Sequence, residues 1–267
     1  MLTAGIPFGG GFAGGIVFLA PEVDWRTVFV IGGVAPIVAA AAMVFWLRES
    51  QGYLAARADR GAAREPMLGG VARALFGEGR AAATLLSWAS FFFTLLVLYL
   101  LLNWLPSLLI GKGFTRPEAV LASLMFTLGG GVGAIGLGSL ARLGHERALY
   151  FVTYVAMAAA LATLAAIGHD FVLALVASAV AGVFVVGSQF LLYGLCATLY
   201  PVRVRGAGVG WAVAVGRLGS VAGPALGGAM LAAGRPPSDV FFMIIPAIGV
   251  ALVAVMLLIR RRPPEAD

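Results

Sequence analysis

Long apolar segments dominate this chain and restrict it to very few folds. Hydrophobic residues make up 61% of its 267 residues and charged residues only 11%, with a mean hydropathy of +1.00. A soluble domain is nearer half apolar and about a quarter charged. Lipid cannot satisfy backbone N–H and C=O groups, and no segment alternates like a barrel strand, so helices are expected. The sequence therefore predicts an all-α polytopic membrane protein.

About eight segments are long enough to cross a bilayer. They cover residues 2–20, 27–47, 82–110, 118–140, 148–168, 171–200, 206–232 and 239–260. A capping-box pattern, Thr115 followed by Pro117 and Glu118, predicts the start of the fourth segment. The polar stretch 48–80 separates two segments from six. Six is the size of one half of a transporter that is built from two six-helix halves.

The distribution of arginine and lysine predicts the orientation of the chain. Thirteen of these residues lie on the side of the 48–80 loop and the C-terminal tail (263–267), and four lie on the other side. The positive-inside rule then places the 48–80 loop and both termini in the cytoplasm. The net charge of +6 does not indicate nucleic-acid binding, because the arginines lie in short loops between apolar segments.

Arg217 is the one charged side chain deep inside an apolar segment. With a helix that begins near Gly206, it lies roughly 16 Å along the axis, near the middle of a hydrocarbon core about 30 Å thick. Burying an arginine there costs on the order of 2.5–3.5 kcal/mol, so such residues usually face a bundle interior or a wet cavity. An anionic ligand would offset this cost, which indicates a transporter of an anion. The alternative is a structural arginine that donates to carbonyl groups of a neighbouring helix.

Two polar stripes predict the wall of a cavity. One helix face carries Trp88, Phe92, Tyr99 and Asn103, and another carries Gln189, Tyr193, Cys196 and Tyr200. Amide and phenol groups in hydrocarbon need partners, so these faces are expected to point inward. Aromatic rings beside Arg217 would suit a flat organic anion with a carboxylate.

Aromatic residues near helix ends have a second explanation. Tyr99, Trp104 and Tyr200 could belong to the aromatic belts at the membrane interface. For Trp104 and Tyr200 a position at the membrane interface is favoured. For Asn103, Gln189 and Tyr193 a position in the cavity wall is favoured.

Glycines recur every four residues on two of the segments. They are Gly219, Gly223 and Gly227 on one segment and Gly129 and Gly133 on another. Such faces let membrane helices approach closely. Packing explains them, and in a rocking transporter the same faces would also slide or bend.

Four stretches of the chain form a distinctive set. They are 24–29 with 32–33 and 47–50, then 102–106, then 187–189 with 197–201, and finally 205–211 with 216–220. Together they resemble the aromatic acid:proton symporters of the major facilitator superfamily over nearly the whole chain. Aligned in this way, the chain corresponds to the family's fifth to twelfth helices, without the first four. The resemblance implies a partial major facilitator fold, with 1–47 as the last two helices of the N-terminal half and 81–262 as the six-helix C-terminal half.

The resemblance also has departures from the family pattern. The family's acidic, proton-linked motif belongs to its first helix, which this chain does not match. Its cytoplasmic loop motif, glycine-x-x-x-aspartate-arginine-x-glycine, retains Arg142 and Gly144 but has Ala141 in place of the aspartate. Arg142, Arg203 and Arg205 are expected to contact helix C-termini or lipid phosphates, or to serve only as positive-inside charges.

The resemblance implies a transporter of aromatic carboxylates that works by proton symport and alternating access in a bacterial-type inner membrane, and no enzyme activity. Arg217 would pair with the carboxylate, while Gln189, Tyr193 and Asn103 would orient the substrate. The expected partners are a small organic anion, a proton and membrane lipids. No metal or cofactor is expected, because one cysteine, Cys196, and two histidines form no ligand cluster.

Two alternatives to this function remain open. One is a major facilitator transporter of another solute, and the other is a non-transporting remnant or interaction subunit. Two helices cannot replace the six-helix half that rocking needs, so the chain alone is not expected to transport.

Overall fold

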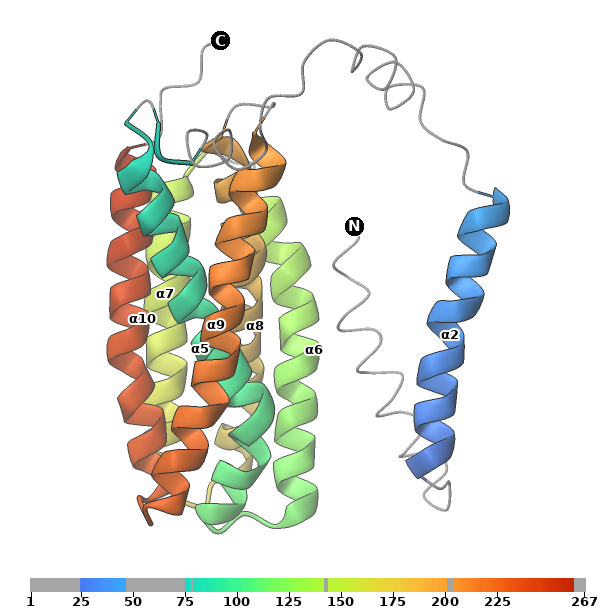
Figure 1. Cartoon of the computed structure of the whole chain (residues 1–267). Coiled ribbons are helices and arrows are strands. Elements are labelled where there is room, and N and C mark those ends of the chain that lie inside the picture. The colour runs from blue at the N-terminus through green and yellow to red at the C-terminus, as the bar shows by residue number, and fades with distance from the viewer. Residues whose placement is uncertain (1–24, 47–74, 78, 142–143, 201–203, 262–267) are drawn as a thin grey trace. The chain divides into compact units, whose positions relative to one another are not determined.

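The computed structural model describes residues 25–46, 75–77, 79–141, 144–200 and 204–261, and all regular structure in these ranges is helical (Figure 1). The chain divides into two compact units, Met1–Gly70 and Val71–Asp267. Helix α2 (Trp25–Trp46) belongs to the first unit. The second unit contains α5 (Ala81–Gly111), α6 (Arg116–Leu140), α7 (Glu146–Ala166), α8 (Phe171–Thr198), α9 (Arg205–Ala232) and α10 (Pro237–Arg260).

The helices of the second unit match the predicted membrane segments. All six are long and apolar enough to cross a membrane, which confirms the all-α polytopic prediction for this part of the chain. Helix α2 covers another predicted segment and contains the apolar stretch Gly32–Met43. The predicted segment 2–20, most of the 48–80 loop and the 263–267 tail lie outside the described residues.

Local sequence signals set the helix ends. The backbone N–H and the hydroxyl of Thr115 both donate to the Glu118 carboxylate at 2.8 Å, which confirms the predicted capping box at the start of α6. Asp170 caps α8 by accepting from the backbone N–H of Leu173 at 3.0 Å. Gly113, with φ +98°, takes the left-handed conformation in the turn between α5 and α6, which favours glycine.

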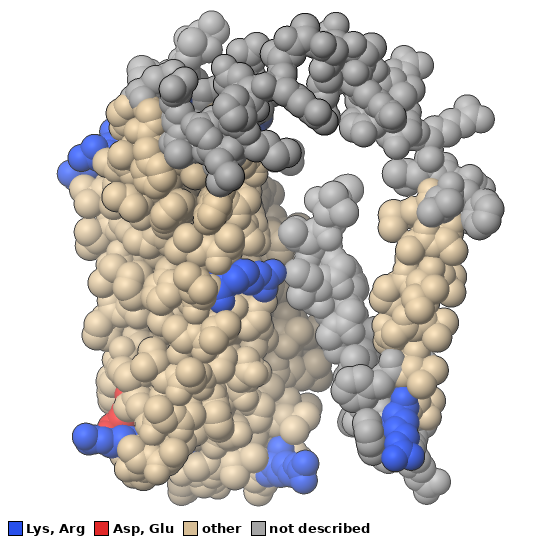
Figure 2. All heavy atoms as spheres, in the orientation of Figure 1, with Lys and Arg blue, Asp and Glu red and all other residues tan. Residues whose placement is uncertain are grey.

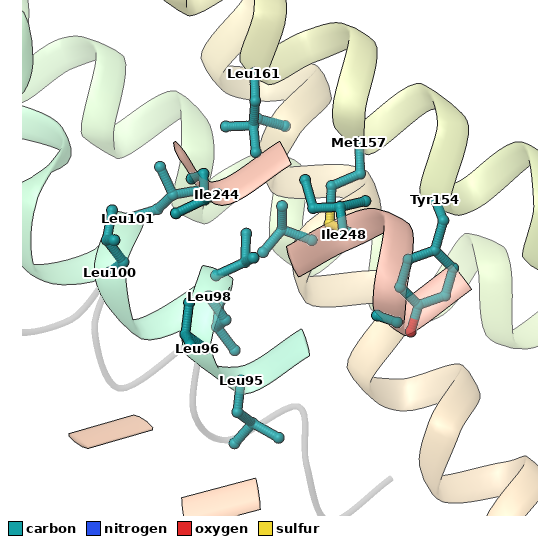
Figure 3. Close-up of a cluster of buried hydrophobic side chains, with 14 of the residues drawn as sticks. Leu95, Leu96, Leu98, Leu100, Leu101, Tyr154, Met157, Leu161, Ile244 and Ile248 are labelled. Carbon is teal, nitrogen blue, oxygen red and sulfur yellow. The ribbon is translucent and has the colours of Figure 1, made fainter. Parts of the chain in front are cut away.

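A dry core lies among α5, α7 and α10. Figure 3 shows leucines of α5 pointing toward side chains of α7 and α10. The members that it labels are Leu95, Leu96, Leu98, Leu100, Leu101, Tyr154, Met157, Leu161, Ile244 and Ile248. The Tyr154 hydroxyl is fully buried and lies 2.8 Å from the hydroxyl of Thr94, so this polar group has the partner that burial requires.

The most extensive helix pairings join α6 to α8 and α5 to α9, which are not neighbours in sequence. Smaller contacts join α10 to α5 and α7, and α7 to α8. The six helices therefore lie side by side in one bundle, as Figure 1 shows.

Glycines line both major pairings. In α9, a Cβ at Gly219 or Gly223 would overlap a backbone carbonyl oxygen of α5. In α6, a Cβ at Gly129 or Gly133 would overlap a carbonyl oxygen of α8. At Gly227 the nearest neighbour is instead the side chain of Trp104, at 2.8 Å from such a Cβ. The helix backbones thus touch at these glycines, an approach that larger side chains would prevent.

Candidate substrate site

Arg217 lies near the middle of the 28-residue helix α9, and its side chain is exposed on the surface of the second unit. Every other described lysine and arginine of this unit lies within about one turn of a helix end. Figure 2 shows this distribution as blue spheres at both ends of the unit and one blue patch partway along its tan face. Arg217 thus lies midway along its helix, as the sequence predicted.

Tyr99 of α5 holds the guanidinium of Arg217. Nη1 of Arg217 donates to the Tyr99 hydroxyl at 2.5 Å, and Cζ lies 5.8 Å from the centre of the tyrosine ring. A guanidinium carries five N–H donors, so this bond leaves most of them for a ligand. Within the described residues Arg217 forms no salt bridge, whereas Arg235 and Asp239 form one at a helix end, at 4.0 Å. The Tyr99 bond therefore orients Arg217 without neutralising its charge.

The close packing of α9 on α5 explains why Arg217 points outward. Gly216, the preceding residue, faces α5, where a Cβ would come within 2.9 Å of the Leu95 side chain and 3.2 Å of Phe91. Gly219 faces the Phe92 carbonyl oxygen on the same side. With these glycines turned toward α5, the helical repeat carries Arg217 toward the open surface.

Gln189 and Tyr193 form a second polar group on α8. Both are half-buried, and Nε2 of Gln189 donates to the Tyr193 hydroxyl at 3.5 Å, a long hydrogen bond. The Tyr193 ring packs edge-on against Phe91 of α5, with ring centres 5.4 Å apart. Phe91 is also a neighbour of Gly216, so this aromatic contact links α8 to the region that carries Arg217.

Asn103 is exposed on α5, one turn beyond Tyr99. Its Nδ2 donates to the backbone carbonyl of Tyr99 at 2.7 Å, which leaves its amide oxygen as an acceptor. The hydrogen bonds of the described residues thus join Tyr99 to Arg217 and Gln189 to Tyr193. They tie Asn103 to its own helix and do not join it to Arg217.

The predicted loop-motif residues are only partly described. Arg142 and Arg203 lie outside the described residues. Gly144 is exposed, with φ +78°, in the turn that precedes α7. Arg205 is exposed at the first position of α9. Glycine suits the left-handed turn at Gly144 for backbone reasons alone.

Two aromatic residues differ from the interface explanation that their sequence position favoured. Tyr200 is 3% exposed, and its hydroxyl lies 3.0 Å from that of Thr84, so it belongs to the interior and not to an interface belt. Trp104 donates from Nε1 to the Pro224 carbonyl at 2.9 Å, and its ring packs on Gly227. Each ring packs on a glycine of α9, Tyr200 on Gly208 and Trp104 on Gly227. These glycines are visible in the sequence, but only the helix pairing shows which aromatic residue faces them.

Trp88, which the sequence placed on the same helix face as Tyr99, forms an aromatic cluster with Phe76 and Trp211 that was not predicted. The Trp88 ring lies 6.2 Å from that of Trp211 on α9 and 5.7 Å from that of Phe76. Nε1 of Trp88 is buried without a hydrogen-bond partner in the described part of the chain. Trp211 is half exposed, so the cluster has an aromatic surface on α9. This surface lies six residues before Arg217.

No group of three or more His, Cys, Asp or Glu side chains within the described ranges is placed to hold a metal ion. A charged group in the α5–α6 turn contacts the last turn of α7. Lys112 donates to the carbonyl of Ala165 at 2.7 Å, and burial lowers the pKa of its ammonium group. His169 packs against the ring of Phe114, with ring centres 6.4 Å apart.

Comparisons with known proteins agree with the resemblance noted in the sequence. The chain matches the family model described as Major Facilitator Superfamily over residues 1–167 and 137–267. It is 39% identical to the 3-(3-hydroxy-phenyl)propionate transporter of Escherichia coli (strain K12), over 98% of this chain and 62% of that protein.

Two further relatives come from Pseudomonas putida. The gallate transporter is 30% identical over 94% of this chain and 62% of its own length. The 4-hydroxybenzoate transporter PcaK is 28% identical over 93% of this chain and 60% of its own length. The chain thus spans about three fifths of the length of these curated relatives, and the predicted resemblance to aromatic acid transporters is confirmed.

Proposed function

Because this chain belongs to the major facilitator superfamily, we propose that it is a transporter, or part of one, that carries aromatic carboxylates across a membrane by alternating access. The observation that carries the proposal is Arg217, a charged side chain midway along a membrane helix and exposed on the surface of the six-helix unit. Tyr99 holds it in place through one hydrogen bond. The remaining guanidinium donors suit a carboxylate, which takes two parallel N–H···O bonds.

The surroundings of Arg217 favour an aromatic anion over an aliphatic one. The Tyr99 ring lies beside the guanidinium, and Tyr193 and Phe91 pack edge-on nearby in the bundle. The relatives are named for hydroxyphenylpropionate, gallate and hydroxybenzoate, which share an aromatic ring and a carboxylate. In this proposal Arg217 binds the carboxylate, while Gln189, Tyr193 and Asn103 donate to or accept from ring substituents.

Proton symport is the second part of the proposal and is supported by the family resemblance. The acidic residues within the described membrane helices, Glu118, Glu146 and Asp239, all lie in first turns. A proton carrier at mid-membrane depth is therefore not supplied by the described helices. Uptake that persists after an uncoupler dissipates the proton gradient would contradict the symport proposal while leaving aromatic acid transport intact.

Substrate binding provides the test of Arg217. The purified protein is incubated with radiolabelled 3-(3-hydroxyphenyl)propionate, gallate, 4-hydroxybenzoate or benzoate, and binding is measured by scintillation proximity. Hydrogen bonds to charged groups contribute about 1.5–3 kcal/mol, so Arg217→Gln should weaken binding by roughly tenfold to a hundredfold. Arg217→Lys should also bind poorly, because lysine cannot form the bidentate pair.

Two controls separate binding from folding. Arg235→Gln removes an arginine at a helix end and should bind as the parent does. Circular dichroism and size-exclusion chromatography should show each variant to be folded. If Arg217→Gln is folded and binds an aromatic acid as tightly as the parent, Arg217 is structural and the anion assignment fails.

The orientation of the chain is also proposed. We place both termini and the 48–80 loop in the cytoplasm of a bacterial-type inner membrane, with 1–47 and 81–262 as parts of the two transporter halves. The test uses single cysteines in a Cys196→Ser background at exposed positions, Arg116 and Arg261.

An impermeant maleimide applied to intact cells should label Arg116→Cys and not Arg261→Cys. The opposite result would reverse the orientation. Equal labelling before and after permeabilisation at both positions would show that the two ends are not on opposite sides.

A further inference from the structure

An apolar groove runs between α5 and α10 and is open along one side. Its volume is about 480 Å³. Its walls are made by Leu86, Ala89, Pro246, Gly249, Val250, Val253, Ala254 and Leu257. Every one of these side chains is nonpolar, and the valines and Leu257 are 41–59% exposed along its length. The groove belongs to neither of the polar groups described above.

The length of the groove corresponds to one leaflet of a bilayer. Pro246, Val250, Val253 and Leu257 follow one another at spacings of four, three and four residues, so they lie on one face of α10. From Pro246 to Leu257 the helix rises about 16 Å. This is close to half of a hydrocarbon core about 30 Å thick. An acyl chain of a lipid occupies the same depth.

Basic residues lie at one end of the groove. Arg260 and Arg261 follow Leu257 by three and four residues, so they continue the apolar stripe of α10 beyond its last nonpolar member. Both side chains are exposed. The one acidic residue of α10, Asp239, lies in its first turn at the opposite end. Figure 2 shows basic side chains at the end of the unit where α10 terminates.

We propose that this groove binds an anionic phospholipid, with one acyl chain along Pro246 to Leu257 and the headgroup phosphate at Arg260 and Arg261. The apolar walls select hydrocarbon, and the two arginines select a negatively charged headgroup. The ligand differs from the transported anion in size, chemistry and place. The site would anchor α10 to α5 and is independent of the Arg217 site.

Native mass spectrometry of the purified protein tests the headgroup. The protein is mixed with equimolar phosphatidylglycerol and phosphatidylcholine, and the lipids that remain bound are counted. The parent should retain phosphatidylglycerol over phosphatidylcholine. With about 1 kcal/mol from each arginine near a headgroup, the double variant Arg260→Gln, Arg261→Gln should weaken phosphatidylglycerol binding about thirtyfold. Its binding of phosphatidylcholine should not change.

Filling the groove tests the acyl-chain site. Gly249 lines the groove, and no atom lies within 4 Å of a Cβ built there, so the side chain of Gly249→Leu starts in open space and occupies part of the groove. This variant should lose phosphatidylglycerol binding by about tenfold or more. Gly136→Leu is the matched control on α6, because a Cβ there also meets nothing within 4 Å. It should bind as the parent does.

Three results would overturn the proposal. Equal retention of the two lipids by the parent would remove the headgroup selectivity. Unchanged phosphatidylglycerol binding by Gly249→Leu would place the lipid elsewhere. A dimer in the native spectra that Gly249→Leu dissociates would show that a second copy of the chain covers the groove instead.

Discussion

The α6–α8 and α5–α9 pairs are both packed through glycines, but in different ways. In the α6–α8 pair, each helix supplies glycines that face the backbone of the other. Gly129 and Gly133 of α6 face carbonyls of α8, and Gly182 of α8 faces the Phe126 carbonyl of α6. In the α5–α9 pair, α9 supplies all the glycines and α5 supplies leucines, phenylalanines and Trp104.

The difference separates a rigid contact from an adjustable one. A backbone carbonyl cannot move aside as a side chain can. The distance between the axes of α6 and α8 is therefore fixed at these glycines. The α5–α9 contact has the same character at Gly219 and Gly223. At Gly227 it depends on the side chain of Trp104, which can change its rotamer. The end of α9 that lies beyond Pro224 is therefore the part best able to shift, while Arg217 lies on the rigid part.

Enlarging a glycine of the rigid pair should have the largest effect. Gly133→Leu places a side chain against the Val183 carbonyl oxygen, and we expect a loss of more than about 4 kcal/mol, enough to prevent recovery of folded protein. Gly136→Leu, one turn away with open space around its Cβ, should fold normally. Fluorescence-detected size-exclusion chromatography measures the folded yield. A monodisperse Gly133→Leu protein with the parent's unfolding temperature would contradict the rigid contact.

Two alanine substitutions on α9 should separate the rigid contact from the adjustable one. Gly219→Ala meets the Phe92 carbonyl and should lower the free energy of unfolding by about 2–3 kcal/mol. Gly227→Ala meets the Trp104 ring and should lower it by about 1 kcal/mol, because that ring can turn aside. Denaturant unfolding in one detergent measures both. Equal losses would show that Trp104 is as fixed as the backbone.

Removing the hydrogen bond of Trp104 should have a smaller effect that is confined to one end of α9. Trp104→Phe keeps a six-membered aromatic ring but removes the N–H that donates to the Pro224 carbonyl. This should lower the free energy of unfolding by about 1 kcal/mol. Hydrogen exchange should increase for residues 225–232 and stay unchanged for 206–218. Uniform acceleration along the whole helix would mean that α9 moves as a single body.

Loss of the Tyr99 hydroxyl should have the smallest effect. Hydrogen bonds inside membrane proteins average about 0.6 kcal/mol, so Tyr99→Phe should weaken aromatic acid binding only about threefold. Tyr154→Phe is the matched control, because its hydroxyl bonds to Thr94 in the bundle core and not to Arg217. If Tyr99→Phe weakens binding as much as Arg217→Gln, the hydroxyl contacts the substrate directly and does more than orient the guanidinium.

The sequence by itself determined where the membrane helices lie along the chain and that Arg217 falls inside one of them. Apolar length fixed six membrane helices to within a few residues, and the Thr115–Glu118 pattern fixed the start of α6, because both depend on local interactions along one helix. The position of Arg217 near the middle of α9 also followed from counting residues along the helix. Glycine spacing indicated which faces pack closely, since periodicity is a property of a single helix.

Only the tertiary structure decided which helices meet. The partner of Arg217 is Tyr99, 118 residues away, and the partner of Trp104 is Pro224, 120 residues away. Nothing in either segment specifies the other, because long-range pairing depends on how all six helices fill space together. For the same reason, Tyr200 could be read as an interface residue until its contact with Thr84 placed it in the interior.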